Sequence, residues 1–114
     1  MASILSADGA VLLDRVWVSG AFERKNAKGL LGRPGLEPGE GLLLHDPTGT
    51  IHMFFMRFPI DAVFLTDDLE VVRVASHLRP WRLARARRAR RILEIGAGEA
   101  VRLGIAVGDR LTLG

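Results

Sequence analysis

Short apolar runs, separated by glycine, proline and aspartate, divide the chain into segments of strand length. Most of these runs are rich in β-branched and aromatic residues, which favour an extended backbone. The pattern predicts about seven strands, at residues 11–18, 41–45, 50–57, 61–65, 70–76, 92–95 and 110–113. Turn residues at 66–69 join two of these strands into a predicted hairpin. The chain is therefore expected to fold mainly as β-sheet.

Two segments are predicted to be helical. Ser19 can cap a helix that continues to about Leu31, and Gly32 can end that helix in the left-handed conformation. Residues 99–103 predict a single helical turn, which Gly104 ends in the same way. Together with the strands, the pattern indicates a mainly β fold. We expect a single compact antiparallel sandwich or barrel, with one short helix in its N-terminal half and one helical turn near the C-terminus.

The segment from His52 to Leu65 combines the strongest apolar character with polar side chains. It contains four of the five Phe and two of the three Met, together with His52, Arg57 and Asp61. Residues 50–57 are apolar on both faces, so we predict a central strand that is covered on two sides. Polar side chains cost free energy to bury unless they are paired. The segment therefore predicts either charges at the exposed end of a strand or a binding cleft.

The length and composition of the chain limit its class. With 114 residues it is expected to form one domain over residues 1–114, because it is too short for two independent cores. It has no Cys, and so neither disulfides nor thiol chemistry. No apolar run approaches the length of a membrane span, and the first residues lack the features of a secretory signal. These observations predict a soluble protein without a membrane partner, in the cytoplasm by default.

Positive charge is concentrated in one stretch, which we call the Arg run. Seven Arg and no acidic residue lie from Arg79 to Arg91, whereas in the rest of the chain nine Lys and Arg face thirteen Asp and Glu, a net charge of −4. Such a run can bind nucleic acid, and Trp81 adds one stacking surface. The candidate contacts are Arg85, Arg87, Arg88 and Arg90. The alternative that we favour is a solvated, mobile connection between two strands, so nucleic acid ranks behind other partners.

Several stretches, in their order and spacing, carry a family resemblance. They are Phe22-Glu-Arg24, Gly29-Leu-Leu-Gly-Arg33, His52-Met-Phe-Phe-Met-Arg-Phe-Pro-Ile-Asp61, Leu78-Arg-Pro-Trp81, Ile92-Leu-Glu94 and Ala97-Gly-Glu-Ala with Leu103-Gly-Ile-Ala-Val-Gly-Asp109. From about Leu12 onward the chain resembles the "domain of unknown function 192" family. The resemblance implies a compact, mainly β single domain with a helix near its start, and it implies no established activity. The Arg run departs from the family pattern, in which that segment is much less basic.

Arg57 and Asp61 are the first candidates for a binding site. If the residues between them bend tightly at Pro59, the two side chains approach each other and can form an ion pair. An Arg that is held by an Asp can present a rigid donor fork to a carboxylate or phosphate. The pair therefore predicts an anion or small-molecule site. The alternative is a structural pair that pins the bend at Pro59.

His52 and Met56 would share one face of a strand, where an imidazole beside a thioether is suited to a soft metal. Methionine is also a common filler of irregular cores. His45 and His77 lie in other segments, and none of the His residues has the spacing of a metal-ligand motif. We therefore predict no metal and no cofactor.

Two further acidic residues have alternative interpretations. Glu94 lies on a predicted strand and could join Asp61 as a carboxylate pair for acid–base chemistry. Alternatively, it faces solvent or pairs with an Arg. Asp109 lies in the turn before the last predicted strand, where an Asp most often accepts hydrogen bonds from backbone N–H groups.

These residues support two hypotheses from different classes. The first is a non-enzymatic binding or accessory domain whose partner is an unknown small molecule or protein. The candidate ligand contacts are His52, Met56, Arg57, Asp61 and Glu94, and all but Met56 are expected to line one concave surface. The second is an enzyme that acts on a small anionic or sugar-like substrate, with Asp61 or Glu94 as the acid or base. No Ser lies in a nucleophile motif, and the sequence leaves open whether the protein is an enzyme.

Overall fold

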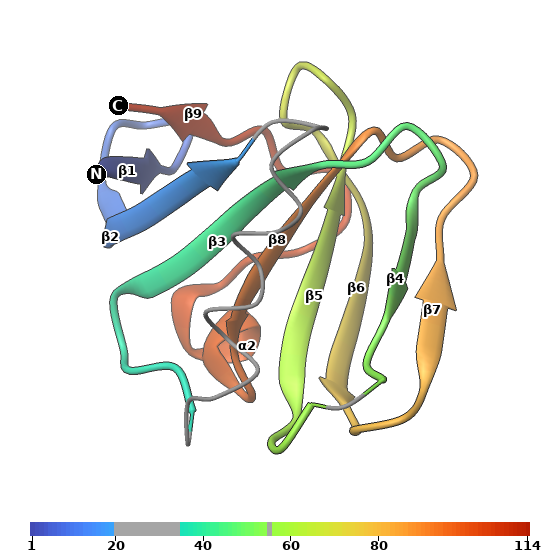
Figure 1. The fold of residues 1–114 in the computed structure, drawn as a ribbon. Helices are drawn as coiled ribbons and strands as arrows, with labels where there is room; N and C mark the ends of the chain where they lie inside the picture. The colour runs from blue at the N-terminus through green and yellow to red at the C-terminus, as the bar shows by residue number, and fades with distance from the viewer. Residues whose placement is uncertain (20–34, 55) are drawn as a thin grey trace.

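The computed structural model describes residues 1–19, 35–54 and 56–114. This part of the chain contains nine strands and one short helix (Figure 1). The strands are β1 (Ala2–Leu5), β2 (Val11–Ser19), β3 (Glu40–His45), β4 (Thr50–His52), β5 (Ile60–Leu65), β6 (Val71–Leu78), β7 (Leu83–Arg85), β8 (Arg91–Gly96) and β9 (Thr112–Leu113). The helix is α2 (Glu99–Leu103). The described chain is therefore mainly β, as predicted.

Seven of the strands form one curled sheet in the order β6-β5-β8-β3-β2-β1-β9. Neighbouring strands are antiparallel except β2 and β3, which run parallel. The other two strands, β4 and β7, form an antiparallel two-stranded sheet, which we call the ribbon. In Figure 1 the ribbon stands beside β6, at the end of the molecule away from β1 and β9.

Two apolar clusters pack on opposite faces of the curled sheet. On one face, Leu93 of β8 packs with Ala100 of α2, and we call this the α2 face. On the other face, Ile92 packs with Ile51 of β4 and Ala84 of β7, and we call this the ribbon face. Successive residues of a strand point to opposite faces. Because both faces are covered here, β5 is buried along its whole length.

Most of the predicted elements are confirmed. The strands predicted at residues 11–18, 41–45, 61–65, 70–76 and 92–95 correspond to β2, β3, β5, β6 and β8. Helix α2 has the predicted bounds, and Gly104 ends it in the left-handed conformation with φ of 72°. The final strand is shorter than predicted, since β9 begins at Thr112. Strand β1 was not predicted.

The prediction of a central strand at residues 50–57 is wrong. Strand β4 covers only Thr50–His52 and belongs to the ribbon. The chain turns directly after it, because the N–H of Met56 donates to the carbonyl oxygen of Met53 at 3.2 Å. The side chain of Phe54 in this turn is 40% exposed. Strand β4 therefore ends at His52, and Phe54 lies in a turn that exposes its ring instead of in a strand that is buried on both faces.

The Arg run is not the irregular connection that we favoured from the sequence. It contains β7, and its Ala84 and Ala89 are buried in the cluster on the ribbon face. The chain also approaches another segment closely here, since a Cβ at Gly49 would overlap the carbonyl oxygen of Ala86. Gly49 has φ of 63°, a conformation that glycine adopts without strain. The Arg run is therefore an integral part of the ribbon.

The predicted antiparallel arrangement has one exception, the parallel pairing of β2 and β3. Parallel neighbours require a crossover connection, which here passes through residues 20–39. The predicted helix from Ser19 to Leu31 lies outside the described residues except for Ser19, which is the last residue of β2. In residues 1–19, 35–54 and 56–114, no helix is long and apolar enough to cross a membrane.

Candidate functional site

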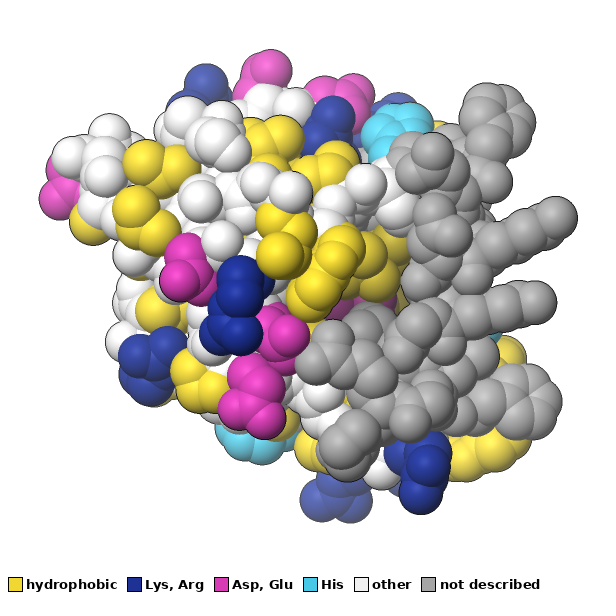
Figure 2. All heavy atoms as spheres, turned by 60° about the vertical axis from the view of Figure 1, so that its left-hand side comes forward, with side chains coloured by type: hydrophobic (Ala, Val, Ile, Leu, Met, Phe, Trp, Pro, Cys, Tyr) yellow, Lys and Arg dark blue, Asp and Glu magenta, His cyan; other side chains and the backbone are white. Residues whose placement is uncertain are grey.

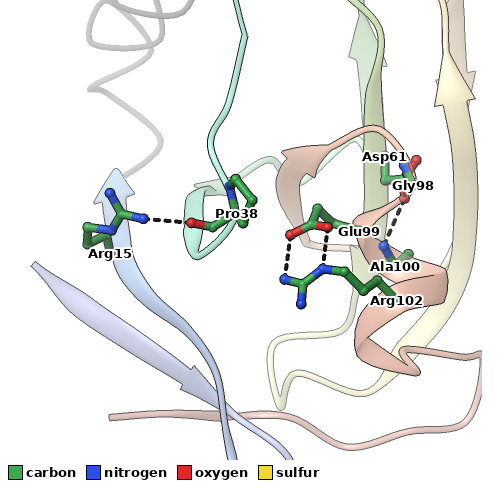
Figure 3. Close-up of polar contacts among 7 residues, drawn as sticks. All are labelled: Arg15, Pro38, Asp61, Gly98, Glu99, Ala100 and Arg102. Atoms are coloured by element: carbon green, nitrogen blue, oxygen red, sulfur yellow. Dashed lines mark hydrogen bonds and ion pairs between the residues drawn. The ribbon is translucent and has the colours of Figure 1, made fainter.

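Asp61 lies on β5, where its side chain points to the α2 face and is fully buried. Its carboxylate accepts three hydrogen bonds from backbone N–H groups. Oδ1 accepts from His77 at 2.9 Å, and Oδ2 accepts from Gly98 at 3.1 Å and Ala100 at 2.9 Å. Figure 3 shows the carboxylate beside the first residues of α2. The N-cap residue of α2 is Gly98, which has no side chain. Asp61 therefore caps the helix from strand β5.

The structure does not bring Arg57 and Asp61 together. Arg57 is exposed in the turn before β5, whereas the carboxylate of Asp61 is enclosed between β5, β6 and α2. No ion pair joins Arg57 to any residue that the structure describes. The predicted contact fails because backbone N–H groups, which the sequence pattern does not reveal, already satisfy Asp61. Asp61 therefore holds the fold, and its burial separates the carboxylate from any ligand at the surface.

Glu94 lies at the centre of β8, directly opposite Leu42 of β3 and Ala62 of β5. Only 5% of the residue is exposed. Its carboxyl makes no hydrogen bond or ion pair within residues 1–19, 35–54 and 56–114. Burial disfavours the charged form and raises the pKa of Glu94 from 4.5 to about 7. Burial thus moves the titration of this carboxyl toward neutral pH.

Asp61 and Glu94 lie on opposite faces of the sheet. Ala62 is directly opposite Glu94, so these two side chains share the ribbon face, and Asp61 next to Ala62 points to the α2 face. The two carboxyl groups cannot meet as the carboxylate pair that we considered for acid–base chemistry. Of the candidates, Met56 is the one that shares a face with Glu94, because it is buried in the cluster on the ribbon face.

His52 lies apart from Glu94, at the exposed end of β4. Its imidazole stacks on the ring of Phe54, with ring centroids 4.9 Å apart and an angle of 28° between the planes. The structure thus divides the five candidates into a buried group with Glu94 and Met56, an exposed group with His52 and Arg57, and the structural Asp61. Within the described ranges, no three His, Asp or Glu side chains are arranged to hold a metal ion.

A hollow of about 270 Å³ lies at another edge of the molecule, between the turn after β1 and the segment after α2. Its lining includes Ser6, Asp8, Leu103, Asp109 and Arg110, and none of the candidate residues. The carboxylate of Asp109 accepts the N–H of Ala106 at 2.9 Å, which confirms the prediction that this Asp satisfies a backbone donor in its turn. Of the candidate residues, Glu94 therefore remains the one whose side chain is best suited to bind a ligand or transfer a proton.

Sequence reasoning gave too little weight to one exposed group, the aromatic side chains of the turns that flank β4 and β7. The rings of Phe54 and Trp81 lie 6.1 Å apart. Trp81 was considered only as an addition to the Arg run, and Phe54 was assigned to a buried strand. The signal that could have found this group is the sequence Arg79-Pro-Trp-Arg82, because Pro at the second position favours a tight turn that presents its third residue.

Comparison with known proteins identifies relatives along nearly the whole chain. Residues 6–113 match the family model DUF192, described as "Uncharacterized ACR". A UPF0127 protein of Thermococcus sibiricus is 33% identical over 107 residues, which cover 90% of this chain and 68% of that protein. A UPF0127 protein of Pyrococcus abyssi is 36% identical over 80 residues, covering 65% of this chain and 68% of that protein.

A crystal structure of a protein of unknown function from Novosphingobium aromaticivorans has a similar fold. It matches with a TM-score of 0.78 and 26% sequence identity, over 97% of this chain and 82% of that one. The family resemblance found in the sequence is confirmed by the extent of these matches. The chain therefore belongs to the DUF192 family, whose proteins are uncharacterised.

Proposed function

We propose that the protein is a small-molecule-binding domain in which Glu94 makes the main polar contact with the ligand. The observation that carries this proposal is a carboxyl group that is nearly fully buried on the ribbon face and has no partner among the described residues. A buried charge is costly unless it meets an opposite charge or a hydrogen-bond donor. A ligand that supplies such a group would remove this cost, and ionisable groups perturbed by burial are common at functional sites.

The surroundings of Glu94 define the class of ligand. The side chains across from it belong to Leu42 and Ala62, and the same face carries Met56 and Ile60. Such a mainly apolar site with one polar group suits a small molecule with an aliphatic body and a single amine or hydroxyl donor. The carboxylate would repel an anion, so the anion site that we predicted from the sequence would have to lie elsewhere, at the exposed Arg57.

The proposal predicts that small aliphatic amines raise the melting temperature of the protein, since binding to the folded state stabilises it. The rise should increase as the pH passes upward through about 7, because a deprotonated Glu94 attracts the ammonium group. Thermal-shift measurements with a series of alkylamines at pH 6 and pH 8 test this. In Glu94→Gln the effect should disappear, whereas Arg57→Ala and Glu99→Gln serve as controls that keep it.

An equal effect of the amines on Glu94→Gln and on the native protein would contradict the proposal. A response that is lost in Arg57→Ala but kept in Glu94→Gln would instead identify a surface site at the turn before β5. The partner would remain a small molecule in that case, and the site would move to the turn before β5.

Acid–base catalysis by Glu94 is a second candidate function, because a pKa of about 7 is well matched to proton transfer at neutral pH. The Glu94 carboxyl would transfer a proton to or from a compound that is bound on the ribbon face. Incubation of each binding compound with the protein, followed by NMR of the mixture, would detect turnover. Conversion that requires Glu94 would favour the enzyme, and unchanged compounds would favour the binding domain.

We also propose that the protein is located in the cytoplasm.

A further inference from the structure

The turn formed by residues 79–82 presents a tryptophan in an unusual backbone conformation. The N–H of Arg82 donates to the carbonyl oxygen of Arg79 at 3.2 Å, which closes a tight turn. Pro80 occupies the second position, and Trp81 occupies the third with φ of 69°. This combination is typical of a type II turn, in which the third position normally holds glycine. A bulky side chain there is strained, and such strain is frequently associated with function.

Two backbone hydrogen bonds fix this turn to the segment after β4. The N–H of Trp81 donates to the carbonyl oxygen of Met53 at 2.7 Å. The N–H of Met53 in turn donates to the carbonyl oxygen of Arg82, also at 2.7 Å. As a result, His52, Phe54 and Trp81 form a group on the surface, which we call the aromatic row. Phe54 is 40% exposed and Trp81 is 59% exposed. The turns that flank the ribbon therefore hold two flat apolar rings, of Phe54 and Trp81, at the surface.

Cationic side chains flank the aromatic row. Arg79 and Arg82 belong to the turn that carries Trp81, and Arg85 lies on the outer side of β7, because Ala84 between Leu83 and Arg85 points inward. Among the described residues, Arg91 is the only member of the Arg run with an ion pair, at 4.0 Å from Asp67. The guanidinium groups beside the aromatic row are therefore available to an anionic partner.

The other end of the molecule has a different surface. Figure 2 brings the side with β1 and β2 forward, where hydrophobic side chains lie among both acidic and basic ones. Exposed residues of this side include Asp14 and Arg15, which form an ion pair at 3.4 Å. In the part of the chain that the structure describes, exposed aromatic rings thus lie beside arginines without ion pairs at the ribbon end.

We infer that the aromatic row and its flanking arginines bind single-stranded nucleic acid. Unpaired bases can stack on exposed rings without regard to sequence, while guanidinium groups contact the phosphates. A duplex offers the phosphates but keeps its bases stacked inside. This function is separate from the proposed role of Glu94, whose side chain points into the ribbon-face cluster. The ordered aromatic row reverses the ranking that the sequence alone favoured for the Arg run.

Fluorescence anisotropy with labelled oligo-dT and oligo-U of about 16 nucleotides, the upper range for one small binding fold, tests this inference. At about 150 mM salt we expect binding that Trp81→Gly weakens at least about fivefold, the effect of losing one stacked base. Glycine suits the φ of Trp81, so this variant should keep the native fold, with a melting temperature no lower than that of the native protein. Trp17→Phe on β2 is the matched control and should bind like the native protein.

A second variant separates stacking from charge. In Arg82→Gln/Arg85→Gln, the slope of log affinity against log salt should fall by about 0.7 for each lost phosphate contact on a single strand. Three results would overturn the inference: no binding by the native protein at this salt, equal binding by Trp81→Gly, or equal affinity for a duplex of the same length. Self-association that Trp81→Gly abolishes, without oligonucleotide binding, would assign the aromatic row to a contact between copies of the chain.

Discussion

Asp61→Ala is expected to lower the free energy of unfolding by about 3–4 kcal/mol. The substitution leaves three N–H groups, of His77, Gly98 and Ala100, without their acceptor, and each unsatisfied buried donor costs about 1–3 kcal/mol. The lower part of that range applies to His77 and Gly98, since both residues lie near the surface. Urea denaturation followed by circular dichroism measures the change.

Two related variants make this prediction specific. Asp61→Asn keeps one carbonyl oxygen and should fall between the native protein and Asp61→Ala. Glu99→Ala removes an ion pair to Arg102 (2.6 Å) on the same helix, and this pair at the surface should contribute less than about 1 kcal/mol. If Asp61→Ala were no more destabilising than Glu99→Ala, Asp61 would not be the anchor of α2.

Glu94→Gln is expected to stabilise the protein at pH 8 by up to about 3 kcal/mol and to have little effect near pH 4.5. The pKa of Glu94 is about 7 in the folded state, compared with 4.5 as its ordinary value. Between these values the folded protein binds more protons than the unfolded one, so native stability falls as the pH rises through this window. Each pKa unit corresponds to about 1.4 kcal/mol, and Gln does not titrate.

Urea denaturation of both proteins at several pH values from 4.5 to 8 tests this dependence. Glu99→Gln provides a control with a different pH window, because the hydrogen bond from Arg102 lowers the pKa of Glu99 below its ordinary value of 4.5. The stabilisation by Glu99 is lost only below that value, so its difference from the native protein should stay constant from pH 4.5 to 8. Parallel pH profiles for the native protein and Glu94→Gln would show that the carboxyl is solvated or paired in the folded state.

The sequence predicted those parts of the fold that local patterns determine. Helix α2 is short and ends at Gly104, whose left-handed conformation is a local property. The β5–β6 hairpin likewise depends on its own turn and on two apolar runs. Strand β4 was misread because an apolar run shows neither where the chain turns nor that the side chain of Phe54 would be exposed. The parallel pairing of β2 and β3 has no local signal at all.

The candidate site was harder to predict because its decisive contacts are remote along the chain. The N–H groups that bind Asp61 come from residues 77, 98 and 100, and backbone donors have no sequence signature. Glu94 was expected at the solvent or beside an Arg, since one polar residue between apolar ones is typical of a half-exposed strand. Strand β8 is instead central and buried from Ile92 to Gly96. Its position in the sheet, and not its composition, determines the state of Glu94.

The backbone of Trp81 has a consequence for how this protein would respond to laboratory evolution. A tryptophan with φ of 69° costs stability that a glycine at the same place would not, and its ring gains little from burial. A library that is selected only for survival at high temperature should therefore discard the ring, because nothing in such a selection rewards it. A library that is selected for the activity of the ribbon should keep it. Opposite outcomes of this kind are the mark of a trade-off between stability and function.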